Sequence, residues 1–293
     1  MRCGLFLPNF GPFADPNAMV SLAVEAEENG WDGFFIWDHL QWDDDQPVAD
    51  PWVVLSAVAA STSTLRFGTA LTPLARRRPW KLARETVTLD HLSGGRLILG
   101  VGLGYAPEFE RGSFPEEPDA RVRAQKLDQA LEILAGLWSG EPFEFSGSHF
   151  QVSRTRFLPK PVQSPRIPVW VGGWWPNKRP YERAARWDGV LTELVGGGTP
   201  SVGQIKDMIA FVAERRENGS PFDVVVNGVS DRDYHRGDEG HPSLVEEYAD
   251  AGVTWWLERF EPDDRFTVEQ VRERILKGPP AGRTKTTSNG GAA

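Results

Sequence analysis

The sequence contains one cysteine, Cys3, and this scarcity excludes an internal disulfide or a metal cluster held by several cysteines. Basic residues are outnumbered, because 32 Lys and Arg stand against 41 Asp and Glu, a formal net charge of −9. The longest basic run, Arg76–Arg78, is too short to follow a nucleic-acid backbone. No apolar run approaches a membrane span, and the N-terminus enters an apolar strand pattern without a signal peptide. We therefore expect a soluble cytoplasmic protein that binds neither nucleic acid nor membrane.

Motifs of several enzyme classes are also missing. The sequence has no nucleophile elbow, no Walker loop and no histidine pair at the helical spacing of metal ligands. We therefore expect no bound metal. The five histidines are scattered along the chain, at His39, His91, His149, His235 and His241.

Short apolar runs alternate with amphipathic helical stretches along the chain, which is typical of a parallel sheet with crossover helices. Eight βα units are the number that closes a barrel. The sequence therefore predicts an α/β fold, a (β/α)₈ TIM barrel, as a single domain over residues 1–278, with a disordered tail at 279–293. The eight predicted strands are Gly4–Pro8, Gly33–Trp37, Leu65–Thr72, Arg96–Val101, Pro168–Val171, Gly189–Leu191, Val224–Val229 and Thr254–Leu257.

The alternation is interrupted after the fourth βα unit, at residues 140–167. Two aromatic-rich segments, Phe143–Phe145 and Phe150–Val152, flank the turn sequence Ser146-Gly147-Ser148. This pattern indicates an inserted hairpin, followed by a proline-rich return to the barrel.

In such a barrel the active site lies on the loops that follow the strands. Asp38 and His39 stand together at the end of the second predicted strand. A histidine there could transfer a proton, or it could only cap a helix or bond a carbonyl, and spacing alone leaves both interpretations open. Glu108 and Glu110 follow the fourth strand, where paired carboxylates could do acid–base work or simply be solvated.

Glycines follow the fourth and fifth predicted strands, at Gly102, Gly104, Gly172 and Gly173. Glycines let a ligand approach the backbone, although tight turns alone would also account for them. The pair Gly172-Gly173 stands just before a predicted helix, whose N-terminus would suit an anion.

Five segments of the sequence form an ordered set: Gly33–His39, Leu65–Thr69 with Thr72-Pro73, Leu89–Leu97, Gly100–Gly104 and Val169–Gly173. In this order they resemble the luciferase-like oxidoreductase superfamily. The family folds as a (β/α)₈ barrel with inserted segments and binds FMN or coenzyme F420 in the barrel mouth, so the resemblance implies a flavin- or deazaflavin-dependent oxidoreductase or monooxygenase. Its members are usually dimers or larger, which implies a homodimer.

The resemblance also implies roles for single residues. Asp38 and His39 match the acid–histidine pair beside the cofactor ring, with His39 as the catalytic residue. Ala70 and Leu71 match the bulge of the third strand, where the family often carries a non-prolyl cis peptide under the ring. Tyr105 is the alternative catalytic residue, together with Glu108. The glycines match cofactor contacts, Gly102 and Gly104 beside the tail and Gly172 and Gly173 at its phosphate.

Two departures bear on the cofactor. The F420-dependent sugar-phosphate dehydrogenases carry a glutamate where this sequence has Tyr105, so their activity is not carried over. The bacterial luciferase branch has an arginine for the FMN phosphate where this sequence has Leu103, and the first arginine is Arg111. This favours F420 over FMN, with Arg76–Arg78 either meeting the acidic tail of F420 or forming a solvated cluster.

Three hypotheses follow. The first is an F420-dependent oxidoreductase that transfers a hydride to or from a small organic substrate. The alternatives are an FMN-dependent monooxygenase and a non-catalytic flavin-binding barrel. An aromatic mouth would favour an apolar or planar substrate, and its candidates are Trp42, Trp80, Tyr105, Trp174 and Trp175.

Overall fold

The computed structural model describes residues 1–43, 45–104, 113–195, 198–216, 219–230, 242–260 and 267–280. Every structural statement below concerns these ranges. The predicted disordered tail lies outside them beyond residue 280, as do several residues singled out in the sequence: Tyr105, Glu108, Glu110, Arg111, His235 and His241.

Eight strands close into a barrel in the order β1-β10-β9-β8-β7-β4-β3-β2, and each neighbouring pair is parallel. The predicted (β/α)₈ barrel is therefore confirmed. All eight predicted strands are present, with shifted ends. Their bounds are β1 (Arg2–Leu7), β2 (Gly33–Ile36), β3 (Arg66–Pro73), β4 (Leu97–Gly102), β7 (Val169–Trp175), β8 (Gly189–Leu194), β9 (Asp223–Gly228) and β10 (Trp255–Arg259).

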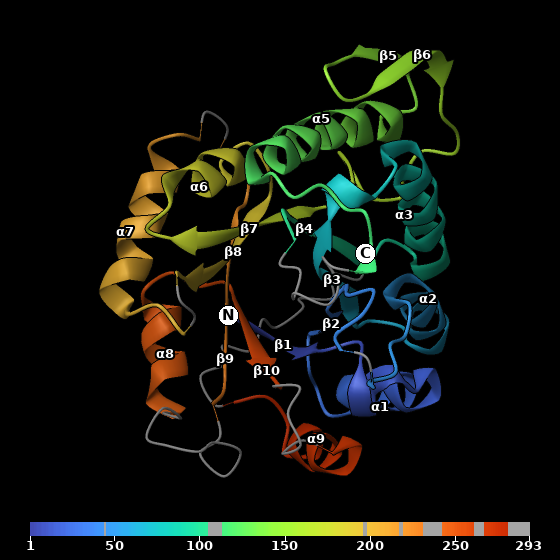
Figure 1. Ribbon diagram of the computed structural model, residues 1–293. Coiled ribbons are helices and arrows are strands. Elements are labelled where there is room, and N and C mark those ends of the chain that lie inside the picture. Colours follow the sequence, from blue (N-terminus) through green and yellow to red (C-terminus); the bar gives the residue numbers. More distant parts are fainter. Residues whose placement is uncertain are drawn as a thin grey trace, which may run out of the picture.

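The helices surround the strands (Figure 1). Local sequence sets their ends: Asp15 and Asp50 cap two N-termini through their side chains, and Gly94 ends the third helix at φ 64°. None of the helices in the described ranges is long and apolar enough to cross a bilayer. The helices are α1 (Pro16–Glu28), α2 (Pro51–Ser61), α3 (Pro79–Ser93), α5 (Ala120–Trp138), α6 (Lys178–Ala184), α7 (Val202–Ala213), α8 (Pro242–Asp250) and α9 (Val268–Leu276).

A two-stranded antiparallel hairpin, β5 (Pro142–Ser146) and β6 (Gln151–Arg156), stands between α5 and β7 in the chain and outside the barrel sheet (Figure 1). Phe143 lies over Gly136 of α5, where an added Cβ would come within 2.0 Å of the Phe143 ring. The hairpin is therefore seated on α5 by an aromatic side chain that only a glycine can accommodate.

The barrel interior is filled by side chains and is not a pore. Phe35, Trp170 and Trp255 touch one another, with ring centroids 4.9 to 5.6 Å apart. Glycines make room for them: a Cβ on Gly33 would lie 2.7 Å from Phe35, and one on Gly189 would lie 2.5 Å from Trp170. Because this aromatic layer plugs the barrel, a ligand has access only at the ends of the strands.

Glu27 of α1 ties the outer helix layer to the loop before β3. Its carboxylate accepts the backbone N–H groups of Ser63, Thr64 and Leu65. Burial alone would raise the pKa of Glu27, but these hydrogen bonds outweigh it and hold the pKa below its ordinary value of 4.5.

We expect Glu27→Gln to lower the free energy of unfolding by about 1–2 kcal/mol at about pH 7. The carboxylate has a lowered pKa in the folded state, so its contribution is complete above the unfolded pKa and is lost as pH falls through the folded pKa. Urea unfolding at about pH 7 and about pH 3 should therefore show the gap between wild type and variant closing in acid. The exposed neighbour Glu28 gives the control, Glu28→Gln, and an equal loss at both pH values would contradict the account.

Candidate active site

The pattern of the barrel interior shows which side chains face the mouth. Side chains alternate between inside and outside along a strand, so positions two beyond an interior residue face inward again. Interior residues occur on β2, β7, β8, β9 and β10, at Phe35, Trp170, Leu191, Val225 and Leu257. The next inward positions, at the carboxyl ends of these strands, are Trp37, Gly172, Glu193, Asn227 and Arg259, with Trp174 two residues beyond Gly172.

The mouth has two walls of different character. Strands four places apart in the closed order face each other, so β2 lies opposite β8 and β3 lies opposite β9. The wall from β1 to β4 is apolar: Phe6, Trp37 and Leu71 all pack with the interior core, and Gly102 follows them. The wall from β7 to β10 is polar and consists of Trp174, Glu193, Asn227 and Arg259.

Leu71 forms the centre of the apolar wall. The peptide bond Ala70-Leu71 is cis and non-prolyl, which confirms the backbone expected there, and the register of β3 against β4 shifts between Thr69 and Thr72. The Leu71 side chain lies across glycines of the next two strands in the barrel, β4 and β7. An added Cβ would come within 3.0 Å of it at Gly102 and 2.1 Å at Gly172, whereas a Cβ on Gly100 would first meet the Thr69 carbonyl oxygen at 2.3 Å. Gly102 and Gly172 therefore make room for Leu71, a role that the sequence did not indicate.

The predicted place of Gly172-Gly173 is wrong. The pair does not form a turn before a helix, because β7 continues to Trp175 and pairs with β8 along its whole length. α6 begins only at Lys178. Gly173 faces outward instead, where its carbonyl accepts the hydroxyl of Tyr181 at 3.3 Å. The two tryptophans after the glycines extend the strand, and a glycine pair alone does not end one.

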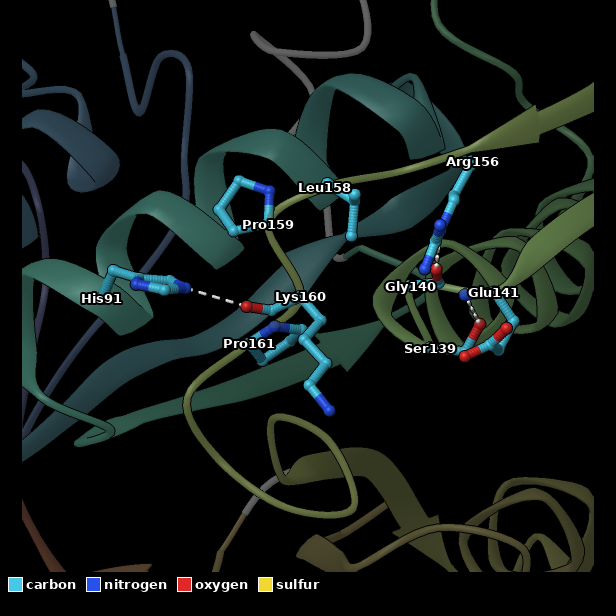
Figure 2. A pocket seen from close by; sticks show the side chains of 9 residues that line it. All are labelled: His91, Ser139, Gly140, Glu141, Arg156, Leu158, Pro159, Lys160 and Pro161. Atoms are coloured by element: carbon cyan, nitrogen blue, oxygen red, sulfur yellow. Dashed lines mark hydrogen bonds between the residues drawn. The ribbon is translucent and has the colours of Figure 1, made fainter.

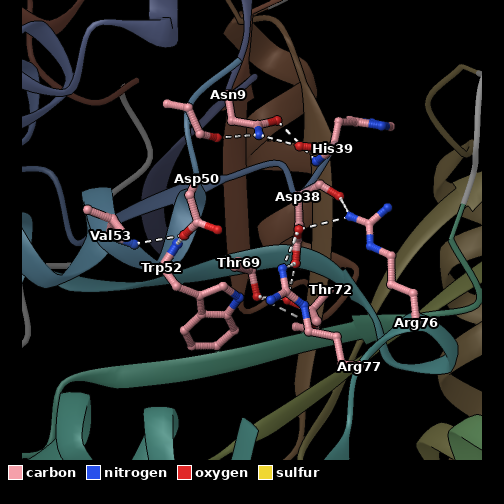
Figure 3. Close-up of polar contacts among 12 residues, drawn as sticks. Asn9, Asp38, His39, Asp50, Trp52, Val53, Thr69, Thr72, Arg76 and Arg77 are labelled. Carbon is pink, nitrogen blue, oxygen red and sulfur yellow. Dashed lines mark hydrogen bonds and ion pairs between the residues drawn. The ribbon is translucent and has the colours of Figure 1, made fainter. Parts of the chain in front are cut away.

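Asp38 lies buried between two arginines (Figure 3). Arg76 donates to Asp38 Oδ1 at 2.9 Å, Arg77 donates to both oxygens at 2.8 Å, and the Thr72 hydroxyl donates to Oδ2 at 2.9 Å. The Asp38 side chain is only 1% exposed. Arg76 also donates to the Asp38 carbonyl oxygen. Through these hydrogen bonds the Asp38 carboxylate connects the end of β2 to the segment after β3.

This cluster corrects the interpretation of Arg76–Arg78 as a solvated group. The guanidinium groups of Arg76 and Arg77 are paired with Asp38. A contact between these arginines and an acidic cofactor tail stays a prediction. Arg78 is exposed and precedes α3. Asp38 is therefore a positioning residue, and its charge is balanced from within the chain.

His39 points away from Asp38 (Figure 3). Its backbone is held on both sides by Asn9, whose Oδ1 accepts the His39 N–H at 3.2 Å and whose Nδ2 donates to the His39 carbonyl at 2.8 Å. The imidazole lies among three aromatic rings, with centroids 5.8 Å from Phe10, 5.9 Å from Trp37 and 5.1 Å from Trp42. Asp38 and His39 therefore have different roles. Asp38 fixes the backbone after β2, and His39 places its imidazole ring at the mouth.

A chain of hydrogen bonds runs along the polar wall. Trp174 Nε1 donates to Glu193 Oε2 at 3.1 Å, and Asn227 Nδ2 donates to Glu193 Oε1 at 3.0 Å. Arg259 Nη1 donates to Asn227 Oδ1 at 3.3 Å. Sequence reasoning missed Glu193, Asn227 and Arg259. Counting inward positions from the apolar centre of each strand would have found them.

The predicted aromatic mouth is correct for some residues and wrong for Trp175. Trp42 stacks on Phe10 with centroids 4.4 Å apart beside His39, and Trp174 lies on the polar wall. Trp80, at the start of α3, contacts Phe150 of the hairpin, and its place in the mouth stays a prediction. Trp175 faces outward, where it is buried and covered by the Lys178 ammonium at 3.4 Å.

A surface groove also lies well away from the mouth (Figure 2). It is lined by His91 near the end of α3, by residues just after α5 and by the segment after β6, and His91 Nε2 contacts the Lys160 carbonyl at 2.8 Å. Helices run opposite to strands in such a barrel, so the ends of α3 and α5 lie at the face remote from the mouth. The groove has no part in the candidate site. In the described ranges, no three His, Cys, Asp or Glu residues come together in a way that could hold a metal ion.

The fold is that of a TIM-barrel protein, with the candidate site at the carboxyl ends of its strands. The luciferase-like monooxygenase family matches residues 1–230, and the chain belongs to this family.

Curated relatives match part of the chain. It is 37% identical over 163 residues to a protein of Microbacterium testaceum named F420-dependent glucose-6-phosphate dehydrogenase, a match of 54% of this chain and 47% of that protein. A protein of the same name from Nakamurella multipartita is 35% identical over 164 residues, covering 54% and 46%. The chain spans about half the length of these relatives.

Solved structures share the fold over nearly the whole chain. An F420-dependent secondary alcohol dehydrogenase, solved with an F420-acetone adduct, superposes with a TM-score of 0.74 at 19% identity and covers 94% of this chain and 98% of that one. A monooxygenase from Streptomyces bottropensis gives 0.76 at 20% identity, covering 94% and 96%. At these identities the likeness concerns the fold alone.

Proposed function

We propose that the protein is an oxidoreductase that uses coenzyme F420 to move a hydride to or from a small organic substrate. The observation that carries the proposal is the apolar wall of the mouth, where Leu71 packs against glycines and Trp37, on the same wall, lies beside the ring of His39. The names of the partial relatives, which specify F420, support this cofactor over FMN.

The mouth fits a flat aromatic cofactor. Leu71 offers an apolar support. A Cβ on Gly102 would lie only 3.0 Å from Leu71, and one on Gly104 only 2.9 Å from Pro73. Because these two residues have no side chain, a ring has room to lie against the wall. Bound there, the deazaflavin ring would supply the position that accepts or releases the hydride. In the proposal Ala70 and Leu71 support the ring.

The remaining site residues have roles in the same proposal. His39 faces the ring and holds or moves a proton, while Tyr105 remains the second catalytic candidate. Asp38 contributes to cofactor binding indirectly by fixing the loop that carries His39. In the proposal Gly102 and Gly104 line the path of the cofactor, and Gly172 contributes by making room for Leu71. Gly173 faces outward and is given no role at the cofactor.

Gly172→Ala should weaken F420 binding about tenfold, because the new methyl group would lie 2.1 Å from Leu71 Cδ1 and displace that side chain. The measurement is the quenching of F420 fluorescence. The control is Gly203→Ala, since the nearest atom to a Cβ on Gly203 is 3.9 Å away. Equal affinities for the two variants would show that Leu71 does not support the cofactor.

The substrate is proposed only as a small organic molecule. Sugar-phosphate activity is not carried over from the partial relatives, because Tyr105 stands where those enzymes have a glutamate. An FMN-dependent monooxygenase is the alternative supported by the family and by the monooxygenase with the same fold. A non-catalytic flavin-binding barrel is the third candidate.

Anaerobic turnover distinguishes these functions. The protein is given F420 with small alcohols, or reduced F420 with small ketones, and the absorbance of the cofactor is followed without oxygen. Turnover supports the proposal. Turnover only with reduced FMN and oxygen would identify a monooxygenase, and F420 binding without turnover would support the non-catalytic barrel.

We also propose a homodimer located in the cytoplasm, as the sequence predicts. Light scattering at micromolar concentration should give about twice the chain mass of 32.6 kDa. A monomer mass alone would contradict the dimer.

A further inference from the structure

We infer that Glu193 determines substrate specificity by accepting a hydrogen bond from a hydroxyl group of the substrate. The inference rests on the proposed function and adds the class of molecule that the site takes. Glu193 faces inward near the end of β8, and β8 lies opposite β2, which leads to Trp37 and His39. A reactant lying on a cofactor at the apolar wall would therefore have Glu193 on its other side.

The contacts of Glu193 fix its hydrogen-bonding direction. Its two oxygens accept one N–H each, from Trp174 at 3.1 Å and from Asn227 at 3.0 Å. An indole nitrogen only donates, and the Asn227 amide is oriented because its oxygen accepts from Arg259, which also only donates. Both neighbours therefore present an N–H donor to Glu193, and the two carboxylate oxygens act as acceptors in these contacts.

Glu193 keeps capacity for a ligand. A carboxylate has about four acceptor positions, and the two N–H contacts leave one on each oxygen. The side chain is partly exposed, so a molecule in the mouth can reach it. Asp38, the other carboxylate singled out at this end of the barrel, is buried under arginines and cannot serve in its place.

The charges of the polar wall determine which kind of substrate group can donate a hydrogen bond to Glu193. Arg259 lies on the same wall as Glu193, one residue away through Asn227, so their opposite charges offset each other. The wall therefore gives little advantage to either an anionic or an ammonium group. A neutral hydroxyl satisfies the remaining acceptor positions without adding charge.

The test compares alcohols with their methyl ethers. Two tertiary alcohols, 1-methylcyclohexanol and 2-methylpropan-2-ol, are used because they carry no hydride on the carbinol carbon and cannot be oxidised. Each alcohol and its methyl ether are titrated into the F420-loaded protein while F420 fluorescence is followed. We expect the wild type to bind each alcohol about tenfold more tightly than its ether, since a hydrogen bond to a charged group has this strength. Glu193→Gln should reduce that preference, because it removes the charge and replaces one of the two acceptor oxygens with a donor.

The controls separate this inference from the proposed function. Affinity for F420 itself is measured first and should stay within about threefold in Glu193→Gln, because Glu193 is assigned to the substrate. Glu214→Gln changes an exposed carboxylate just after α7 and should behave as the wild type. Failure of the wild type to bind F420 would refute the proposed function.

Two other outcomes would overturn the role of Glu193 alone. One is an unchanged alcohol preference in Glu193→Gln, or no preference in the wild type, despite normal F420 binding. The other is a large loss of F420 affinity in Glu193→Gln with an unchanged melting temperature, which would assign Glu193 to the cofactor.

Discussion

Asp38→Ala is expected to lower the free energy of unfolding by about 3–5 kcal/mol, the usual cost of removing one partner from a buried ion pair. The variant leaves the guanidinium groups of Arg76 and Arg77 facing each other, with side chains only 9% and 19% exposed. The Thr72 hydroxyl also loses one of its two acceptors, Asp38 Oδ2, and keeps Thr69 Oγ1. Urea unfolding at neutral pH measures the effect.

Two further variants show whether buried charge is the cause. Asp38→Asn keeps an acceptor for Thr72 but removes the charge, so it should retain part of the stability. Glu85→Ala breaks an exposed pair with Lys81, whose side chain is 67% exposed, and should cost less than about 1 kcal/mol. An Asp38→Ala effect as small as that of Glu85→Ala would show that the arginine cluster does not hold this end of the barrel together.

His39→Ala should reduce turnover about a hundredfold, within the usual contribution of a positioned proton-transfer group. The backbone at residue 39 is held by Asn9 and does not depend on the imidazole, so the loop should survive the substitution. Affinity for F420 should therefore fall much less than turnover. Steady-state kinetics with a substrate found in the anaerobic assay, together with a cofactor titration, separates the two effects.

His91→Ala is the matched control, because that imidazole lies on the outer groove and contacts a backbone carbonyl far from the mouth. It should leave turnover unchanged. If His39→Ala kept full turnover and only melted at a lower temperature, His39 would be structural, and the catalytic assignment would pass to Tyr105 or Glu108.

The barrel could be predicted from sequence because its strands are covered on both faces. Such strands are short continuous apolar runs, as in Gly33–Ile36, and they stand out against the amphipathic helices between them. Helix ends can also be predicted from sequence, because capping residues such as Asp50 and Gly94 act within one turn of the helix.

The site was less predictable because its contacts join distant parts of the chain. Asp38 meets arginines 38 and 39 residues away, and no local pattern distinguishes a paired arginine from a solvated one. The role of a glycine is equally hard to read from sequence. The sequence predicts that Gly172 contacts the cofactor, whereas the packing of the neighbouring strands shows that it makes room for Leu71.

The end of β7 shows a further limit of sequence reasoning. Glycine often marks a turn, so the sequence predicts that the strand ends before Gly172-Gly173, whereas pairing with β8 carries it on to Trp175. That extension places Trp174 beside Glu193. The error of four residues at this strand end therefore hid the contact between these two side chains.

The central claim is that the mouth of this barrel binds coenzyme F420 in preference to FMN. The most direct test is a parallel titration of the purified protein with the two cofactors, followed by their fluorescence at the same ionic strength. We expect F420 to bind at least about tenfold more tightly than FMN, a difference in binding free energy of about 1.4 kcal/mol. Tighter binding of FMN, or equal affinity for both, would contradict it.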